Sequence, residues 1–259
     1  MDALIGRTGF VGSTLLRQRT FDCGFSSTDI AGIRNGSFDT VVCAGAPAAK
    51  WVADRDPPAD LANIQGLADH LSTIQAERFI LISTVDVFAD SSGMDEDSAI
   101  EEDGLTAYGR NRVWLERFVA DRFSQALIVR LPGLVGPGLR KNAIFDFRNG
   151  NNLGSIDARA VYQFYPMVNL WSDLVTASAA GLSLLHLTAE PLSIADVAAE
   201  GFGLFFDNRV EGRQPASYDF QSKHAALFGG RGRYTYDRRE SLQAIRAYAQ
   251  SEPASQPLA

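Results

Sequence analysis

The chain has 259 residues, of which 46% are hydrophobic and 21% charged, a composition typical of an ordinary globular protein long enough to bury a sizeable core. Its net charge of −7 argues against a nucleic-acid-binding protein, because no basic face is evident. The three histidines and two cysteines are scattered, so no metal-ligand spacing is present and we expect no metal. No apolar run approaches the ~18 residues of a membrane span, and no apolar leader segment is evident, so we expect a cytoplasmic protein that does not bind membranes.

Apolar runs of strand length alternate with segments of helical periodicity. Strands are expected at 4–5, 21–25, 41–44, 79–82 and 126–131. Helices are expected to start near Ser13 and to cover 57–75, 106–123, 171–185, 192–202 and 240–248, with a frayed tail at 251–259. This alternation is typical of a parallel sheet covered by helices on both faces, so the predicted fold class is α/β.

The first strand runs directly into a turn that contains Gly6, Gly9 and Gly12. A dinucleotide pyrophosphate needs a tight turn, a backbone bare enough for phosphate to approach, and a helix N-terminus whose free N–H groups attract anions. Three glycines at this spacing also arise by chance, and a plain strand–turn–helix corner is the alternative interpretation. The position of the turn nevertheless predicts that the chain binds NAD or NADP.

Two pairs of residues further along could carry chemistry. Ser83 and Thr84 follow the strand at 79–82, and ligands of open α/β sheets bind beyond the carboxyl ends of the strands. A hydroxyl there can donate to a substrate oxygen, or it can merely cap the strand. Tyr108 and Arg112 are four positions apart and share a helix face. A nearby cation favours the phenolate, which would allow Tyr108 to act as a general acid or base; an exposed pair with a packed ring is the alternative.

These features resemble the extended short-chain dehydrogenase/reductases, that is, the NAD-dependent epimerase/dehydratase family. The similarity includes the glycine turn, the hydroxyls at Ser83-Thr84, the spacing from Tyr108 to Arg112, and Glu116 in phase with them. It is clear from residue 4 to about 138 and diffuse afterwards. The interval of 24 positions between Thr84 and Tyr108 (108 − 84) resembles the shorter members of the family, similar to the dTDP-4-dehydrorhamnose reductases.

The resemblance implies a fold and a division of the chain. The fold would be a Rossmann-type doubly wound parallel sheet with a small C-terminal substrate lobe. A dinucleotide-binding domain is expected at 1–131, completed by about 166–187. The substrate-binding lobe is expected at 132–165 and 188–259. The helix that carries Tyr108 and the helix at 57–75 often form the dimer interface in this family, so a homodimer is a possible assembly.

The resemblance also implies roles for the candidate catalytic residues Thr84, Tyr108 and Arg112. Thr84 would orient the substrate oxygen, and Tyr108 would be the acid/base. Arg112 stands where the family has a lysine that holds the nicotinamide ribose and lowers the pKa of the tyrosine. This replacement is not conservative, and no other lysine lies close in the sequence to compensate. Asp86 stands where the dehydratases of the family have an acid/base carboxylate; a structural hydrogen bond is the alternative.

The cofactor contacts implied by the resemblance are Gly6, Arg7, Thr8, Gly9, Phe10, Val11, Gly12, Asp29, Ile30, Ala44, Gly45, Asn63 and Pro132. An acidic residue after the second strand would hold the ribose 2′-hydroxyl of NAD, whereas an arginine suits the 2′-phosphate of NADP. Ser26 and Ser27 stand there instead. Arg7, inside the glycine turn, gives a slight preference for NADP, and a solvent-facing Arg7 is the alternative.

Three functions follow from this reading. The first is an NAD(P)-dependent oxidoreductase or epimerase that acts on a nucleotide-activated sugar, a small-molecule substrate. The second is an NAD(P)-binding protein with little or no catalysis, in a sensor or assembly role, because Arg112 replaces the family lysine. The third is an enzyme that acts on a carbonyl compound other than a sugar, since a fold does not fix a substrate.

Overall fold

The computed structural model describes residues 1–254, which divide into two compact units. The first unit consists of residues 1–90, 96–131 and 171–186. The second unit consists of residues 91–95, 132–170 and 187–254 of the described chain. None of the helices within these described residues has both the length and the apolar character needed to cross a lipid bilayer. Each unit is described by itself below.

The first unit is built on a six-stranded sheet in which every strand is parallel to its neighbours. Its strands are β1 (Asp2–Ile5), β2 (Cys23–Phe25), β3 (Ser37–Cys43), β4 (Gln75–Thr84), β5 (Ala126–Leu131) and β9 (Leu184–His186). They lie in the order β2-β1-β3-β4-β5-β9, which confirms the predicted doubly wound α/β class. Strand β2 is an edge strand, since it stands first in this order. The chain passes from β2 to β3 through a 3-10 turn, η1 (Ile30–Ile33).

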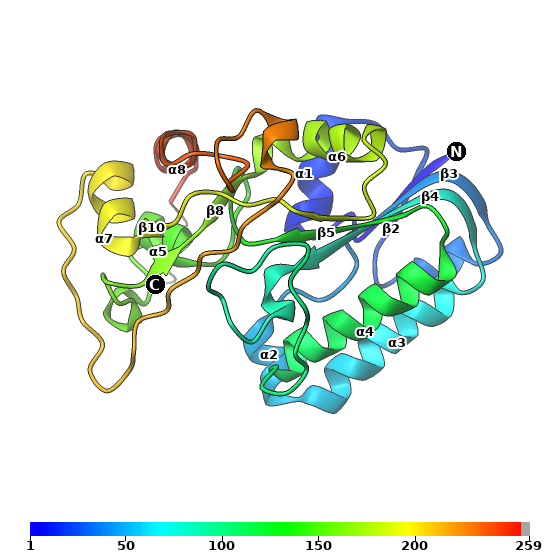
Figure 1. The fold of residues 1–259 in the computed structure, drawn as a ribbon, viewed down its shortest axis with the longest axis horizontal. Helices are drawn as coiled ribbons and strands as arrows, with labels where there is room; N and C mark the ends of the chain where they lie inside the picture. The colour runs from blue at the N-terminus through cyan, green and yellow to red at the C-terminus, as the bar shows by residue number, and fades with distance from the viewer. Residues whose placement is uncertain (255–259) are drawn as a thin grey trace. The chain divides into compact units, whose positions relative to one another are not determined.

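Helices cover both faces of this sheet (Figure 1). One face carries α1 (Phe10–Gln18) and α6 (Leu170–Ala179), and the other carries α2 (Lys50–Arg55), α3 (Pro57–Leu71) and α4 (Ala107–Arg122). Their starts follow ordinary capping rules. Asp56 caps α3 ahead of Pro57, and Thr106 caps α4 by accepting from the backbone N–H of Gly109. A 3-10 turn, η2 (Val85–Val87), follows β4 directly.

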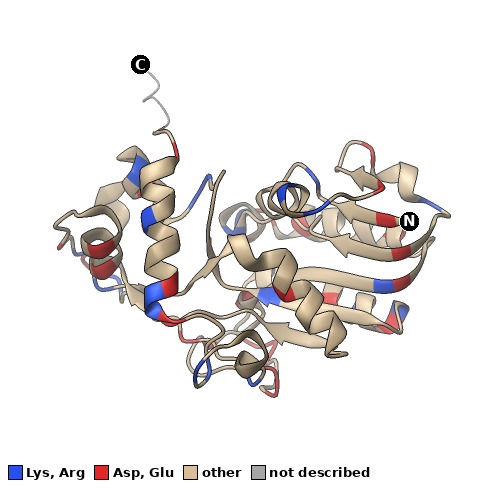
Figure 2. Ribbon diagram, turned by 90° about the horizontal axis from the view of Figure 1, so that it is seen from above, with Lys and Arg blue, Asp and Glu red and all other residues tan. Residues whose placement is uncertain are grey.

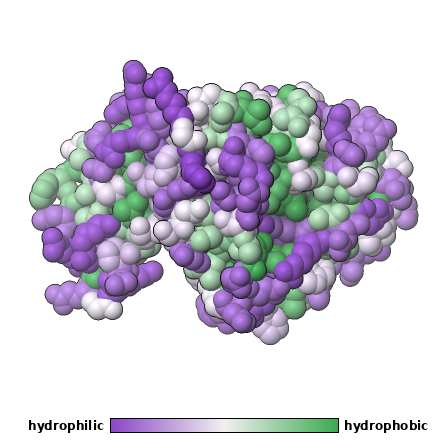
Figure 3. All heavy atoms as spheres, viewed as in Figure 1, coloured by the Kyte–Doolittle hydropathy of each residue, from purple (hydrophilic) through white to green (hydrophobic). Residues whose placement is uncertain are grey.

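The core of the first unit lies between the sheet and helices α3 and α4. Phe79 of β4 and Phe123, at the end of α4, stack with ring centroids 4.1 Å apart. Ile64 and Leu71 of α3 and Leu115 of α4 belong to the same buried cluster. On the face shown in Figure 3, hydrophilic and hydrophobic residues are intermixed.

The second unit contains short strands and three helices. Its strands are β6 (Gly133–Val135), β7 (Val161–Tyr162), β8 (Phe164–Pro166) and β10 (Leu192–Ser193), in which β6 pairs with β8 and β7 with β10. Its helices are α5 (Ala143–Asn149), α7 (Ile194–Asp196) and α8 (Arg238–Ser251), and its other helical turns are η3 (Leu153–Ser155), η4 (Met167–Asn169), the π-helical η5 (Val197–Phe202) and η6 (Ala225–Phe228). Acidic and basic residues gather at the N-terminal end of α8 (Figure 2).

Several predicted helices differ in extent from the structure; the one predicted at 57–75 ends at Leu71, and Gln75 already belongs to β4. The segment predicted as one helix at 171–185 is α6 followed by β9, because Gly181 adopts a φ of +66° after α6 and ends it. The short apolar run of β9 cannot be told from a helix by periodicity. The segment 192–202 begins as β10, and its helical part starts only after Ser193 caps α7. The last predicted helix is longer than 240–248 and reaches Ser251, while residues 255–259 of the expected tail lie outside the described residues.

A buried polar network ties α4 to three strands of the sheet. Glu116 of α4 forms an ion pair with Arg130 of β5 at 2.6 Å, and both side chains are 5% exposed. Glu116 also accepts a hydrogen bond from the hydroxyl of Ser83 on β4, and Arg130 contacts the ring of His186 on β9 at 3.2 Å. Because removing one member of a buried ion pair strands the other charge, this network fixes α4 on the sheet.

We predict that Glu116→Ala lowers the free energy of unfolding by about 3–5 kcal/mol, because it leaves the Arg130 guanidinium buried without its partner. The matched control is Glu102→Ala, since Glu102 pairs with Arg117 in an exposed ion pair and its loss should cost less than about 1 kcal/mol. Chemical denaturation of both variants measures the difference. Equal losses would show that the buried network does not hold α4.

Candidate functional site

The candidate site lies at the carboxyl edge of the sheet, where the strand order reverses between β1 and β3. Ligands of open α/β sheets bind beyond the carboxyl ends of the strands at such a reversal. Gly6 follows β1, and Ala44 and Gly45 follow β3 on the neighbouring strand. The two strand ends are in register, since Ile5 pairs with Cys43 and the backbone N–H of Ala44 donates to the Ile5 carbonyl.

Two of the three glycines in the turn are required by close backbone contacts. Gly6 has a φ of +84°, and a Cβ built there would lie 2.3 Å from the carbonyl oxygen of Ala44. A Cβ on Gly12 would lie 2.1 Å from the carbonyl oxygen of Gly6. A Cβ on Gly9 would lie 3.4 Å from that oxygen, which is an ordinary contact. Gly6 and Gly12 therefore hold β1, β3 and the start of α1 closer together than any side chain allows.

The N-terminus of α1 is suited to an anion. Its N-cap residue is Gly9, no side chain caps it, and no acidic residue occupies its first turn. The first N–H groups of a helix have no partner within the helix and carry a partial positive charge, so they attract phosphate. The outer residues of the turn, Thr8 and Gly9, are exposed. A dinucleotide pyrophosphate fits this turn, because the exposed Gly9 leaves the backbone at the start of α1 open to a phosphate.

Arg7 and Asp29 form an ion pair beside the glycine turn. Asp29 also accepts hydrogen bonds from the backbone N–H and the hydroxyl of Ser26, and these bonds, with the Arg7 charge, hold the pKa of its carboxyl below the usual value. Ile30, the other residue of the predicted adenine contact, begins η1. The side chain of Arg7 lies along Gly24 of β2, where a Cβ would come within 3.2 Å of its Cδ. The pair is about 40% exposed, so solvent screens it.

Tyr108 is held at the end of β4 by three contacts. Its backbone N–H donates to Asp54 of α2 at 3.0 Å. The next residue, Gly109, lies so close to Asp86 that a Cβ there would be 2.3 Å from the Asp86 carbonyl oxygen. Thr84, the last residue of β4, accepts from the backbone N–H of Asp86 at 3.1 Å and hydrogen-bonds the Tyr108 side chain. Thr84, Asp86 and Tyr108 thus form one cluster.

Burial decides the protonation of Tyr108. The side chain is 8% exposed, and this desolvation raises the pKa of its phenol above the ordinary value. The charge of Arg112 and the hydrogen bond from Thr84 act in the opposite direction, but they are smaller effects. The charge of Arg112 lowers the pKa of Tyr108, as expected for a neighbouring cation, but burial outweighs it in the chain without a cofactor.

Arg112 is engaged in structural contacts. It is buried and pairs with both carboxylate oxygens of Asp60 on α3, and it donates to the backbone carbonyl of Pro47. Its guanidinium carbon lies 3.9 Å from the centroid of the Tyr108 ring, a cation–π contact with the ring face rather than a hydrogen bond to the hydroxyl. The geometry expected of the family lysine is absent at this position.

Lys50 lies in this cluster but was not among the residues predicted from the sequence. It is the first residue of α2, and its Nζ lies 2.8 Å from Oδ1 of Asp86. The charges of both Lys50 and Asp86 act on the pKa of Tyr108. No spacing rule links Lys50 to Tyr108, because they lie on different helices. The only signal in the sequence is that the chain has just three lysines, of which Lys50 alone precedes Tyr108.

Two further predicted cofactor contacts lie at other elements. Asn63 is exposed on α3. Pro132 comes directly after β5 and is the first residue of the second unit's stretch 132–170. The remaining contacts of the turn, Phe10 and Val11, form the first turn of α1. The described residues hold no group of three or more His, Cys, Asp or Glu side chains that could bind a metal ion.

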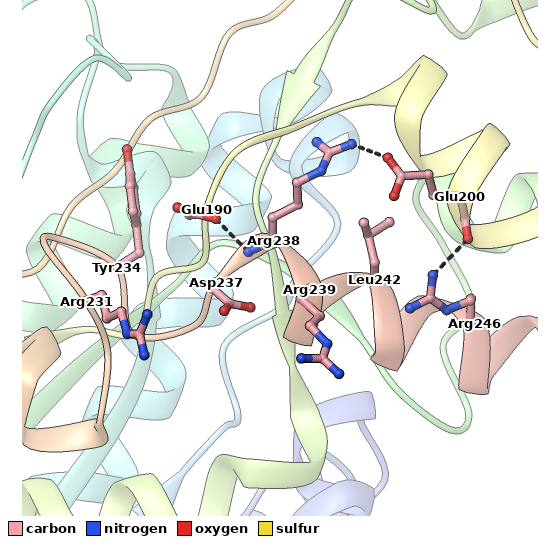
Figure 4. Close-up of a pocket in the computed structure, with 9 residues that line it drawn as sticks. All are labelled: Glu190, Glu200, Arg231, Tyr234, Asp237, Arg238, Arg239, Leu242 and Arg246. Atoms are coloured by element: carbon pink, nitrogen blue, oxygen red, sulfur yellow. Dashed lines mark hydrogen bonds and ion pairs between the residues drawn. The ribbon is translucent and has the colours of Figure 1, made fainter.

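A charged pocket of about 430 Å³ lies within the second unit, around the start of α8 (Figure 4). Arg238 pairs with Asp196 and Glu200, and its backbone N–H donates to Glu190 at 2.7 Å. Arg246 donates to the backbone carbonyl of Glu200 at 3.4 Å. These contacts anchor the start of α8 to the rest of the second unit.

Together, the parallel sheet and the glycine turn define a Rossmann-like α/β fold. No model of a protein family matches the sequence, and no curated protein matches it either. Solved structures do resemble the chain. A dTDP-4-dehydrorhamnose reductase from Bacillus anthracis in complex with NADP aligns at a TM-score of 0.73 and 16% identity, over 95% of this chain and 96% of that one.

Two further structures resemble the chain as closely. A dTDP-4-dehydrorhamnose reductase from Clostridium acetobutylicum has a TM-score of 0.71 and 18% identity, over 96% of this chain and 98% of that one. MoeE5 in complex with UDP-glucuronic acid and NAD also has a TM-score of 0.71 and 18% identity, over 97% and 99% of the two chains. At these identities the likeness establishes the fold and confirms the predicted Rossmann-type architecture.

We predict that Gly12→Ala destabilises the protein by about 1–3 kcal/mol, because its Cβ collides with the Gly6 carbonyl and the backbone must shift. Gly9→Ala is the matched control, since its Cβ meets that oxygen only at contact distance. Thermal unfolding of the two variants measures the difference. Similar stability for both would contradict the close approach of Gly6 and Gly12.

Proposed function

We propose that the chain is an NAD(P)-dependent oxidoreductase that reduces a carbonyl group on a nucleotide-activated sugar, with Tyr108 as the proton donor. The observation that carries this proposal is the cluster of Thr84 and Tyr108 at the end of β4, on the same sheet edge as the glycine turn. The complexes of similar structures with NADP, and with NAD and UDP-glucuronic acid, support the cofactor and substrate class.

In the reductive direction Tyr108 would be the proton donor. A bound reduced nicotinamide would supply the hydride. The phenol of Tyr108 would give its proton to the substrate oxygen as that oxygen gains negative charge, and the positive charges that lower the pKa of the phenol make this transfer easier. The Thr84 hydroxyl lies beside the Tyr108 side chain and would donate to the phenolate that remains, which lowers the pKa of the phenol.

Arg7 supports NADP as the cofactor. Its ion pair with Asp29 is exposed enough for the guanidinium to exchange the carboxylate for a 2′-phosphate, with which arginine forms strong bidentate hydrogen bonds. Asp29 would then stay anchored by the backbone N–H and hydroxyl of Ser26. Without the arginine, the free carboxylate of Asp29 would repel a phosphate and could accept a ribose hydroxyl.

We predict that Arg7→Ala weakens NADPH binding by about tenfold or more, while NADH binding is retained or improved. The matched control is Arg17→Ala on α1, whose side chain contacts Thr14 rather than Asp29. Fluorescence titrations with both cofactors measure the two dissociation constants. An equal loss for NADPH and NADH would contradict a role of Arg7 in recognising the 2′-phosphate.

A second candidate function is NAD(P) binding with little or no catalysis. The commitment of Arg112 to Asp60 and Pro47 favours it, because the cation expected beside the tyrosine hydroxyl serves the fold instead. The two functions differ in turnover. A protein that binds a dinucleotide and reduces none of a broad set of nucleotide sugars and simpler carbonyl compounds would support the second.

We predict that Tyr108→Phe lowers kcat by about 10²–10⁴-fold and leaves the dinucleotide dissociation constant unchanged, since it removes the transferable proton and little else. Tyr248→Phe on α8 is the control for removing a tyrosine hydroxyl elsewhere in the chain and should keep its activity. Steady-state kinetics and cofactor titrations measure both effects. Full activity in Tyr108→Phe would refute the proposed role.

A homodimer remains a prediction. Trp51 on α2 is 67% exposed, and Trp114 on α4 is 38% exposed and stacks on Phe118. These rings leave apolar surface on the helices of the first unit that a second copy of the chain would cover.

A further inference from the structure

The resemblance predicts a cation at position 112 that acts on the hydroxyl of Tyr108, but the contacts of Arg112 do not supply one. Arg112 has the right spacing, but its two terminal nitrogens bind Asp60 and the Pro47 carbonyl. Its remaining nitrogen, Nε, is buried without a hydrogen-bond partner among the described residues, so it has no access to a ligand. Arg112 therefore has no N–H group to offer at the mouth of the site.

A second cation reaches the same cluster from α2. The Lys50 ammonium binds Asp86 at 2.8 Å, and Asp86 is the residue against which Gly109 packs beside Tyr108. Lys50 is 40% exposed, so it lies at the open side of the cluster rather than in the core. An ammonium has three N–H donors. Within residues 1–254, one N–H of the Lys50 ammonium donates to Asp86.

Helix α2 is fixed at both ends of its short length. Asp54, one turn after Lys50, accepts the backbone N–H of Tyr108, which places both residues on the face of α2 that meets η2 and α4. Just before α2, the carbonyl of Pro47 accepts from Arg112. The buried pair of Arg112 and Asp60 thus anchors the segment that carries Lys50.

We propose that Lys50 is the cation that serves Tyr108, and that Arg112 is a positioning residue that holds the segment carrying Lys50. The lowering of the tyrosine pKa, which the resemblance assigns to a residue on α4, would thus fall to a lysine on α2. This inference rests on the proposed function in so far as it assigns Tyr108 a proton to move, but the coupling of Lys50 to Tyr108 can be measured without cofactor.

Charged groups surround Tyr108 on three elements. Lys50 and Asp54 lie on α2, Asp86 on η2 and Arg112 on α4. The positive charges of Lys50 and Arg112 lower the pKa of the phenol, and the charge of Asp86 raises it. Removing Lys50 takes away one positive charge and its ion pair with Asp86, and both changes raise the pKa of Tyr108.

The test is a titration of the cofactor-free protein labelled with 3-fluorotyrosine, which ionises at lower pH than tyrosine. Fluorine NMR follows each phenol, and the Tyr108 signal is assigned by its loss in Tyr108→Phe. We expect Lys50→Met to shift the ionisation of Tyr108 to higher pH and Lys50→Arg to restore it. The matched control is Lys141→Met in the second unit, which should leave it in place. An unchanged ionisation in Lys50→Met overturns the proposal.

Kinetics provide the second readout. We expect Lys50→Met to lower kcat by about tenfold or more, with thermal stability close to wild type because the side chain is partly exposed. Arg112→Lys, which restores the family residue, should lower rather than raise kcat, because an ammonium cannot bind Asp60 and Pro47 together. A higher kcat in Arg112→Lys contradicts the division of roles. A wild-type protein that reduces no carbonyl contradicts only the proposed function, since the titration needs no turnover.

Discussion

The close approach of three backbone segments at the glycine turn is the constraint on which the site depends. Gly6 lies against Ala44, and Gly12 lies against Gly6, at distances that exclude any Cβ. These contacts bring the ends of β1 and β3 and the start of α1 to one place. They also place the N-terminus of α1, which no side chain caps, at the exposed Gly9, where a diphosphate can approach the backbone.

Helix α4 holds Tyr108 at this edge of the sheet. Tyr108, Arg112 and Glu116 recur every four residues along one stripe, and each has a different task. Glu116 fixes the helix to β4 and β5 through Ser83 and Arg130. Arg112 fixes it to α3 and to the segment before α2, and Tyr108 is thereby held beside Thr84. Two buried ion pairs thus support one phenol.

Much of the first unit was predictable because its signals are local. Apolar runs mark β3, β4 and β5, and caps and periodicity mark α3 and α4. The stripe from Tyr108 to Glu116 follows from helical spacing. The strand β9 was missed because a short apolar run after a helix has no period of its own. Lys50 was missed because an ion pair between α2 and η2 depends on how the chain folds back, which no spacing records.

Calorimetric titration of the folded wild-type protein with NADPH and NADH tests the account most directly. If the glycine turn receives a diphosphate, one molecule of at least one of these dinucleotides binds to each chain with measurable heat. A correctly folded protein that binds neither of them would contradict the account, because the cofactor and the proton transfer from Tyr108 both depend on that turn.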